Sequence, residues 1–282
     1  MDYELTQREF DQLSRLVYEK SGINLHQGKR ELVRARLSRR LRETGLGSFQ
    51  AYYDYVMRED TGRELVALLD SISTNLTSFF REPAHFNFLR QEVLPALAAR
   101  RGAGSRRLWV WSAGCSSGEE PYSIALCVLK ALRNTVGWDI KILATDISTR
   151  TLETAQRGIY PAQRVATVPR EMLSRYFQRG VGEWTGHYRV KAEVRRLIEF
   201  RRSNLLEGPP VSGQFEVIFC RNVMIYFDTA TQERVINIFR DRLLPGGFLF
   251  IGHSESLARV KHSLRYVRPA VYCRHARAVG IH

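Results

Sequence analysis

The chain has 282 residues, of which 44% are hydrophobic and 26% charged, as in an ordinary globular protein with enough chain for one large domain or two smaller ones. No segment approaches the roughly 20 apolar residues of a membrane span, and residues 1–5 lack a basic signal-peptide start, so we expect a cytoplasmic protein without membrane insertion. The four cysteines form no Cys-x-x-Cys pair, which predicts buried, reduced thiols and no metal site. A net charge of +14 predicts an acidic partner, and nucleic acid, anionic lipid and acidic protein all satisfy that requirement.

Residues 1–85 have the pattern of an N-terminal helical domain. A capping box at residues 6–9 opens an apolar stripe with helical spacing, and a second helix is expected from about residue 29 to residue 44. Two further helices should start at the caps Ser48 and Thr61, and another near Pro83. The small residues at 101–105 are the best candidate for a flexible boundary.

Residues 86–282 have the pattern of an α/β domain. Short apolar runs at 108–111, 140–144, 215–219 and 248–251 are separated by helical patterns, which predicts a doubly wound, mainly parallel sheet. Residues 266–274 could add an antiparallel edge strand. Two short strand patterns within residues 180–203, at 187–190 and 197–200, predict a small inserted antiparallel β-subdomain.

The turn at residues 112–120 follows the first strand and opens a helix. Its small residues, including Gly114, would let the backbone approach a ligand closely. Glu119 and Glu120 at the start of the helix disfavour a phosphate and favour a cationic ligand. An equally open alternative is that the two glutamates only stabilise the helix dipole.

Asp146 ends the second strand, where a doubly wound nucleotide-binding fold places an acid that binds ribose hydroxyls. Its alternative role is to cap the next helix. Because nicotinamide enzymes share the glycine turn and the distant acid, an oxidoreductase stays open at this point.

Five segments stand out in chain order, at residues 74–82, 118–123, 144–147, 204–206 and 219–227. Together they resemble the CheR family of chemotaxis receptor methyltransferases. The resemblance implies a Rossmann-like, S-adenosylmethionine-dependent methyltransferase domain of the α/β class, with an N-terminal helical domain and a small antiparallel β-subdomain. It also implies methyl transfer from S-adenosylmethionine to glutamate side chains of chemoreceptors in chemotaxis adaptation. The products are glutamyl methyl esters and S-adenosylhomocysteine.

By motif match, the resemblance implies a cofactor pocket formed by Asn75, Thr77, Arg81, Gly114, Glu120, Asp146, Asn204, Leu205, Arg221 and Asn222. Arg81 would meet the methionine carboxylate of the cofactor, and Asp146 its ribose. Arg221 and Tyr226 would be catalytic and face the methyl group and the incoming glutamate. Without the resemblance, Tyr226 could equally be a core aromatic and Arg81 a surface charge.

The helix at residues 29–44 is strongly basic. Lys29, Arg36, Arg39 and Arg40 gather on one shoulder, and because like charges four residues apart repel, an absent anionic partner explains them better than a solvated face does. In the family, this helix faces the glutamate-bearing helices of the receptor. Gly180 and Gly182 resemble a Gly-x-Gly loop that captures a receptor's C-terminal tail, and an ordinary glycine turn is the alternative.

The basic charge also suggests a rival, a methyltransferase acting on RNA or DNA. Enzymes that methylate base amines usually carry an acidic residue or Asn followed by Pro-Pro and an aromatic at the end of one sheet strand. After the run at 215–219 this chain instead has Arg221-Asn222-Val223-Met224, and its basic segments lack interleaved aromatics. We therefore expect chemoreceptors as partners, no nucleic acid, a monomeric enzyme and a cytoplasmic location at receptor arrays. A non-catalytic scaffold that binds the cofactor remains the other alternative.

Overall fold

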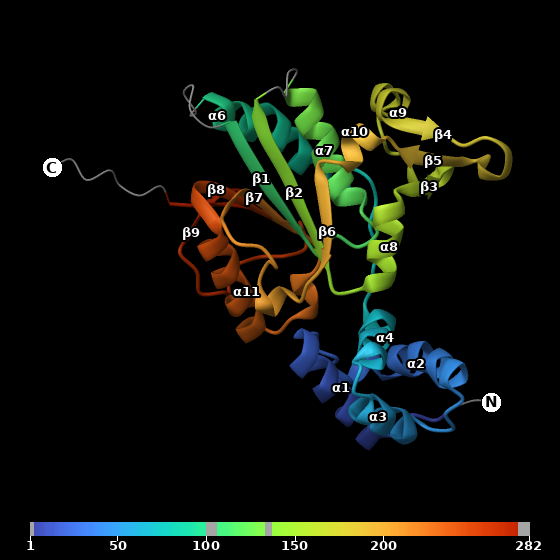
Figure 1. Cartoon of the computed structure of the whole chain (residues 1–282). Coiled ribbons are helices and arrows are strands. Elements are labelled where there is room, and N and C mark those ends of the chain that lie inside the picture. The colour runs from blue at the N-terminus through green and yellow to red at the C-terminus, as the bar shows by residue number, and fades with distance from the viewer. Residues whose placement is uncertain (1–2, 100–105, 133–136, 276–282) are drawn as a thin grey trace.

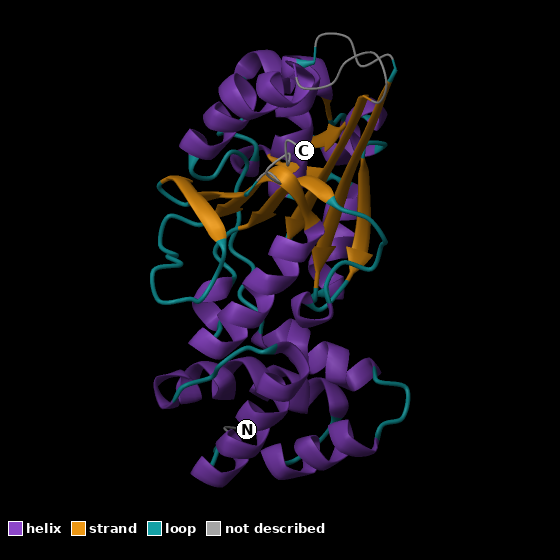
Figure 2. Cartoon of the chain, turned by 90° about the vertical axis from the view of Figure 1, so that its left-hand side faces the viewer, coloured by secondary structure: helices purple, strands orange, loops and turns teal. Residues whose placement is uncertain are grey.

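A computed structural model describes residues 3–99, 106–132 and 137–275. Its helical N-terminal part lies at one end of the molecule and its sheets at the other (Figure 1, Figure 2). The boundary expected at residues 101–105 lies outside the described residues, and the division of the chain at residue 85 stays a prediction.

The N-terminal part consists of α1 (Gln7–Ser21), α2 (Arg30–Thr44), α3 (Phe49–Arg58) and α4 (Arg63–Ile72), with a 3-10 turn (Gln27–Lys29) before α2. The capping box at Thr6 and Glu9 is confirmed, since the Thr6 hydroxyl accepts from Glu9 N and the Glu9 carboxylate accepts from Thr6 N. Apolar stripes of all four helices, among them Phe10, Leu37 and Leu68, share one core.

The two helix caps predicted after α2 have different outcomes. Ser48 is confirmed, because its hydroxyl accepts from Ala51 N at 3.1 Å. Thr61 is wrong as the cap of α4: Gly62 occupies that position with φ +69°, and Glu59 accepts from Glu64 N. The carboxylate of Glu64 does not cap this helix and instead pairs with Arg40 of α2.

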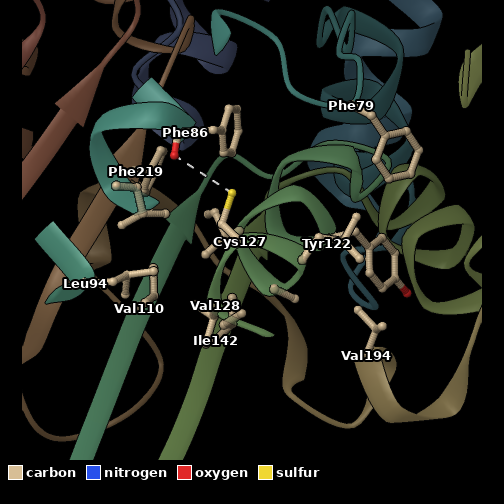
Figure 3. Close-up of a cluster of buried hydrophobic side chains, with 14 of the residues drawn as sticks. Phe79, Phe86, Leu94, Val110, Tyr122, Cys127, Val128, Ile142, Val194 and Phe219 are labelled. Atoms are coloured by element: carbon tan, nitrogen blue, oxygen red, sulfur yellow. Dashed lines mark hydrogen bonds between the residues drawn. The ribbon is translucent and has the colours of Figure 1, made fainter. Parts of the chain in front are cut away.

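Helices α5 (Pro83–Phe88) and α6 (Leu94–Ala99) are joined by a π-helical turn (Leu89–Val93) and contact α7 (Glu119–Ala131). Figure 3 shows how they cover the sheet, with Phe86 and Leu94 packed near Phe219 and Val110. All four cysteines are buried and free, as expected, and Cys127 lies in this core.

The main sheet contains β1 (Arg106–Ala113), β2 (Trp138–Asp146), β6 (Ile198–Arg202), β7 (Phe215–Cys220), β8 (Leu243–Ile251), β9 (Leu264–Arg268) and β10 (Val271–Arg274). The strand order is β6-β2-β1-β7-β8-β10-β9, and every neighbouring pair from β6 to β8 is parallel. Antiparallel β10 and β9 form the predicted edge. Helix α11 (Thr229–Arg242) packs Val235 and Phe239 on the face opposite α7. The predicted doubly wound fold is confirmed.

The order of strands reverses at β1, because the chain runs outward to β2 and β6 on one side and to β7 and β8 on the other. In open α/β sheets, ligands bind beyond the carboxyl ends of the strands at such a reversal. In this structure the helical N-terminal part lies beyond that end of the sheet (Figure 1).

The small antiparallel sheet is inserted between α8 (Thr149–Arg157) and β6. Its strands β3 (Ile159–Pro161), β4 (Phe177–Arg179) and β5 (His187–Val190) have the order β3-β5-β4. Helices α9 (Arg170–Tyr176) and α10 (Ala192–Arg195) and 3-10 turns at Ala162–Arg164 and Gly182–Trp184 complete it. The sheet therefore begins well before the residue 180 that the sequence indicated.

The strand pattern at 197–200 does not belong to this insertion. It forms β6, which pairs in parallel with β2 in the main sheet. Ile198 and Phe200 pack near Ala144 and Leu152, while Arg201 and Arg202 are exposed. An edge strand with one polar face shows the same alternation of polar and apolar residues as a hairpin strand. For this reason residues 197–200 were wrongly expected in the inserted subdomain.

Within the described ranges, no helix combines the length and apolar character needed to cross a bilayer.

A buried charge cluster joins α2, α3 and α4. Arg40 Nη2 lies 2.7 Å from Glu64 Oε2, and the Tyr52 hydroxyl donates to Glu64 Oε1 at 2.7 Å. Glu64 is only 7% exposed. Removing Glu64 would leave the buried Tyr52 hydroxyl without its acceptor and Arg40 with Glu43 as its remaining acidic partner, and losing one partner of a largely buried ion pair is costly.

We therefore expect Glu64→Ala to lower the free energy of unfolding by about 3 kcal/mol, measured by urea denaturation. Glu31→Ala is the matched control, because Glu31 pairs with Arg34 at 2.9 Å but is 74% exposed, so its loss should cost about 0.5 kcal/mol or less. Equal losses of unfolding free energy in the two variants would contradict a stabilising role for the cluster of Arg40, Tyr52 and Glu64.

Candidate functional site

A cleft lies at the carboxyl ends of β1, β2 and β7, against the N-terminal helices. It holds about 980 Å³ when its open mouth is included. All the residues expected to contact the cofactor, and also Tyr226, line this cleft. The structure thus brings together side chains from five separate segments of the chain, although their individual roles stay predictions.

The glycine turn forms the floor of the cleft. Gly114 has φ +83°, and a Cβ there would lie 2.5 Å from Val223 Cγ2, so only glycine fits. Ser116 follows, also with positive φ, and its hydroxyl donates to Asn75 O at 2.9 Å. This bond connects the turn after β1 to the loop that carries Asn75 and Thr77.

Asp146 lies at the end of β2 and is 8% exposed. One carboxylate oxygen accepts from Ser116 N at 2.7 Å and the other from Ser148 N at 2.9 Å. Helix α8 is capped by Ser148, not by Asp146. Burial raises the pKa of Asp146 although these backbone donors oppose the shift. A neighbouring cation or hydroxyl group would stabilise the carboxylate.

Arg221 is the centre of a charge cluster that we call the Arg221 cluster, formed by Arg221, Glu82 and Glu120. Its guanidinium lies 3.0 Å from Glu82 Oε2 and 3.2 Å from Glu120 Oε2, and it also donates to Arg81 O. The Arg221 side chain is 2% exposed. Burial raises the pKa of Glu120 despite the Arg221 charge. With two carboxylates beside it, Arg221 is poorly suited to pair with a third.

Glu82 also connects the cleft to the loop after β8, because His253 N donates to its carboxylate at 3.2 Å. Among the described residues, Glu82, His85 and His253 are the one group whose ligand atoms approach one another closely enough to hold a metal, within 4.8 Å. Burial, chiefly, and the Arg221 charge lower the pKa of His85 to about 3. The guanidinium of Arg221 already supplies the cation at Glu82.

Backbone strain concentrates around the cleft. Five non-glycine residues of the described chain have positive φ. Four of them, Phe80, Glu82, Ser116 and Asn222, lie in the loops that form the cleft or its walls. Such conformations cost roughly 1–2 kcal/mol each and persist where the surrounding structure enforces them, often at functional sites.

The helical part closes one side of the cleft through long-range hydrogen bonds. Asn24 N donates to Tyr226 O at 2.8 Å, and Asn204 Nδ2 donates to Lys20 O at 2.9 Å. Arg36 reaches from α2 to the loop before Asn75, where it bonds Ser73 O at 3.3 Å and Thr74 Oγ1 at 3.1 Å. Arg81 holds the same loop from the other end by donating to Leu76 O.

These contacts change the interpretation of the basic helix. Arg40 does not lack an anionic partner, because it pairs with Glu64, and Arg36 is engaged by the cleft loop. Arg39 is the exposed member, with its side chain 71% accessible and paired only along the surface with Glu43 at 2.8 Å. Lys29 is half-buried at the end of the turn before α2.

Gly180 and Gly182 lie in the loop between β4 and β5. A Cβ on Gly180 would lie 2.0 Å from Trp184 O, and Gly182 has φ +60°. Val181 between them is 81% exposed and Trp184 is 49% exposed. The loop borders a second pocket on the small sheet, and none of the residues that line it also lines the cleft.

The small sheet is nevertheless connected to the cleft floor. The Tyr160 hydroxyl donates to Ser117 O at 2.6 Å, and Arg164 Nη2 donates to Ser117 Oγ at 2.9 Å.

The prediction missed Ser116, Glu82 and Glu255. Glu82 lies beside Arg81 in the segment 74–82 that carries the family resemblance, so its position offered a signal. Glu255 stands in no recognised motif, although its carboxylate accepts from Asn222 N at 2.9 Å.

Comparison with known proteins gives matches along nearly the whole chain. Residues 8–73 match the family described as CheR methyltransferase, all-alpha domain, and residues 75–273 match CheR methyltransferase, SAM binding domain. The chain is 42% identical to chemotaxis protein methyltransferase 2 of Pseudomonas aeruginosa, covering 96% of this chain and 94% of that protein. It is 41% identical to the chemotaxis protein methyltransferase of Escherichia coli K12, covering 95% and 91%.

The two family matches follow each other in the order of the helical part and the α/β part. The second contains all the cleft residues expected to contact the cofactor, while Ser21, Ile23 and Ile72 of the first also line the cleft. We conclude that the chain belongs to the CheR methyltransferase family and is an S-adenosylmethionine-dependent methyltransferase.

Proposed function

We propose that this enzyme methylates glutamate side chains of chemoreceptors, acting as a monomer in the cytoplasm at receptor arrays. The observation that carries the proposal is the single cleft in which all the cofactor residues expected from the sequence meet Tyr226. Its relatives are named as chemotaxis protein methyltransferases, which supports chemotaxis as the pathway.

The cleft suits a cofactor that carries positive charge. Glu120 and Asp146 are buried carboxylates, and burial raises the pKa of each. Gly114 lines the same cleft, with Val223 packed closely against it. S-adenosylmethionine supplies a methyl group on a positively charged sulfur, and we assign its amino-acid end to Asn75, Thr77 and Arg81 and its ribose to Asp146.

The acceptor needs little chemical activation. A glutamate carboxylate has a reference pKa of about 4.3 and is already ionised at neutral pH, so no general base is required. The protein's task is to align the acceptor oxygen and to exclude water around it. A tight cationic partner would stabilise the acceptor's ground state and slow the transfer.

Tyr226 meets this requirement better than Arg221. Tyr226 is half-buried on the 3-10 turn Met224–Tyr226 and lines the cleft, and its hydroxyl can donate one neutral hydrogen bond to the acceptor. The charge of Arg221 is balanced by Glu82 and Glu120, so we assign Arg221 to shaping the wall and to a weak electrostatic contribution.

We therefore expect Tyr226→Phe to lower kcat roughly 10-fold while the Kd for S-adenosylmethionine changes less than about 3-fold, because one transition-state hydrogen bond is lost. Single-turnover methylation and calorimetry measure the two quantities. Unchanged turnover would remove Tyr226 from the mechanism.

The raised pKa values predict a pH dependence of cofactor binding. As pH falls toward those values, Glu120 and Asp146 take up protons that a cationic ligand must expel, so the Kd for S-adenosylmethionine should rise as the pH is lowered. S-adenosylhomocysteine lacks the sulfonium charge and should show a shallower slope. Calorimetry with both ligands checks this, and equal slopes would contradict the electrostatic role of the two carboxylates.

We place receptor docking on the exposed face of α2. Arg39 is its most accessible predicted contact, and its surface pair with Glu43 is weak enough to be exchanged for a receptor carboxylate. Arg36 and Arg40 are poor test positions, because they support the cleft loop and the helical core.

Arg39→Glu should raise the KM for receptor at least about 5-fold and leave cofactor binding unchanged. Arg240→Glu is the matched control, since Arg240 is also a partly exposed helical arginine paired with a neighbouring acid, Asp241, at 2.9 Å. Equal effects of both reversals would point to net charge alone and against docking at α2.

The exposed loop around Val181 and Trp184 supports a second contact, in which a receptor tail peptide adds to the small sheet. Tethering would raise the local concentration of substrate without new contacts at the cleft. Receptors with and without the tail should then differ in methylation rate with this enzyme.

Methyl-labelled S-adenosylmethionine tests the function directly. Incubated with receptor fragments and with RNA and DNA, the enzyme should put base-labile label on the receptor only. Stable label on nucleic acid would support the rival enzyme class, and absence of transfer would support a non-catalytic scaffold.

A further inference from the structure

The segment at residues 252–255, Gly-His-Ser-Glu, follows β8 and packs against the loop between β7 and Tyr226. Glu255 Oε2 accepts from Gly252 N at 2.6 Å and from Asn222 N at 2.9 Å. Glu255 Oε1 accepts from Ile225 N at 3.3 Å. One carboxylate thus gathers backbone donors from both ends of the turn that leads to Tyr226.

Within this turn Tyr226 N donates to Val223 O at 3.1 Å and Gln232 Nε2 donates to Met224 O at 2.9 Å, whereas the N–H groups of Asn222 and Ile225 donate to Glu255. Strand β7 ends at Cys220 and the 3-10 turn begins at Met224, so residues 221–223 lie outside regular structure. Asn222 has φ +59°, a conformation that needs support from its surroundings. Hydrogen bonds from backbone N–H groups to a carboxylate are charge-assisted and about twice as strong as neutral ones.

Gly252 makes the close packing possible. A Cβ at this position would lie 2.6 Å from Asn222 Nδ2 and 2.9 Å from Asn222 N. The backbone of the segment therefore approaches the turn more closely than any larger residue allows.

The same segment also supports the other side of the cleft. His253 N donates to the Glu82 carboxylate, which lies 3.0 Å from the guanidinium of Arg221. Residues 252–255 thus touch both the Arg221 cluster and the turn before Tyr226, yet they are not among the residues that line the cleft.

We propose that Glu255 is a positioning residue for methyl transfer: it holds the turn at residues 222–225 so that the Tyr226 hydroxyl faces the acceptor. Both of its oxygens bond to backbone, so it acts through Tyr226 and not by contact with cofactor or receptor. The inference rests on the role proposed for Tyr226.

A double-mutant cycle tests this. Glu255→Gln keeps the side-chain length but turns part of the acceptor into a donor facing N–H groups. We expect it to lower kcat about 10-fold at saturating S-adenosylmethionine. In the Tyr226→Phe background the same change should lower kcat less than about 3-fold, because both substitutions remove one interaction.

Two further variants separate positioning from general damage. Gly252→Ala leaves the carboxylate in place but pushes the turn, and it should show the same coupling to Tyr226. Glu233→Gln is the control, since Glu233 also accepts from a backbone N–H, that of Lys261 at 3.2 Å, in a segment that does not lead to Tyr226. It should leave kcat unchanged. Thermal melting shows that each variant is folded.

The outcomes are distinct. If the unmodified enzyme forms no base-labile methyl ester on receptor, the proposed function fails. If the enzyme is active but Glu255→Gln leaves kcat as unchanged as Glu233→Gln does, the positioning role is overturned. The same holds if Glu255→Gln lowers kcat by the same factor with and without Tyr226→Phe.

Discussion

The buried pairing of Arg221 with Glu82 and Glu120 is the interaction on which the site depends. A lone guanidinium that is 2% exposed would be very unfavourable, and two carboxylates from different segments remove that cost only if both are held in place. Glu120 comes from the start of α7 and Glu82 from the start of α5, while Arg221 follows β7. The cleft therefore forms as a unit, because none of these segments satisfies its buried charge without the other two.

Some residues of the site could be predicted from the sequence and others could not. Asp146 and Gly114 stand at strand ends where the fold class itself places ligand contacts, and the motif around Arg221 is distinctive in sequence. Glu255 was not predictable in this way, because its importance comes from three backbone N–H groups, and backbone donors leave no trace in residue identity. Glu82 stood within the motif, but only the structure shows that it faces Arg221.

The fold was predictable where burial is regular, at every residue in β7 and along one stripe in α1. It was not where an element is short or edge-exposed. Residues 198–202 alternate polar and apolar because β6 is the outermost strand, and sequence alone does not distinguish this from a strand in a separate hairpin. The density of arginine in α2 was likewise ambiguous: Arg40 has its counter-ion in Glu64, and that carboxylate comes from another helix.

Because the helical part supplies one wall of the cleft, it decides how much of the chain is needed for methyl transfer. Ser21, Ile23 and Ile72 line the cleft, and Asn24 and Lys20 accept or donate bonds to the segments that carry Tyr226 and Asn204. The segment from residue 75 to residue 273 thus contains every side chain that we assign to the cofactor, but only part of the wall of the cleft. Without residues 8–73, this segment would form a cleft that lacks one wall. The two family segments therefore make up one catalytic unit.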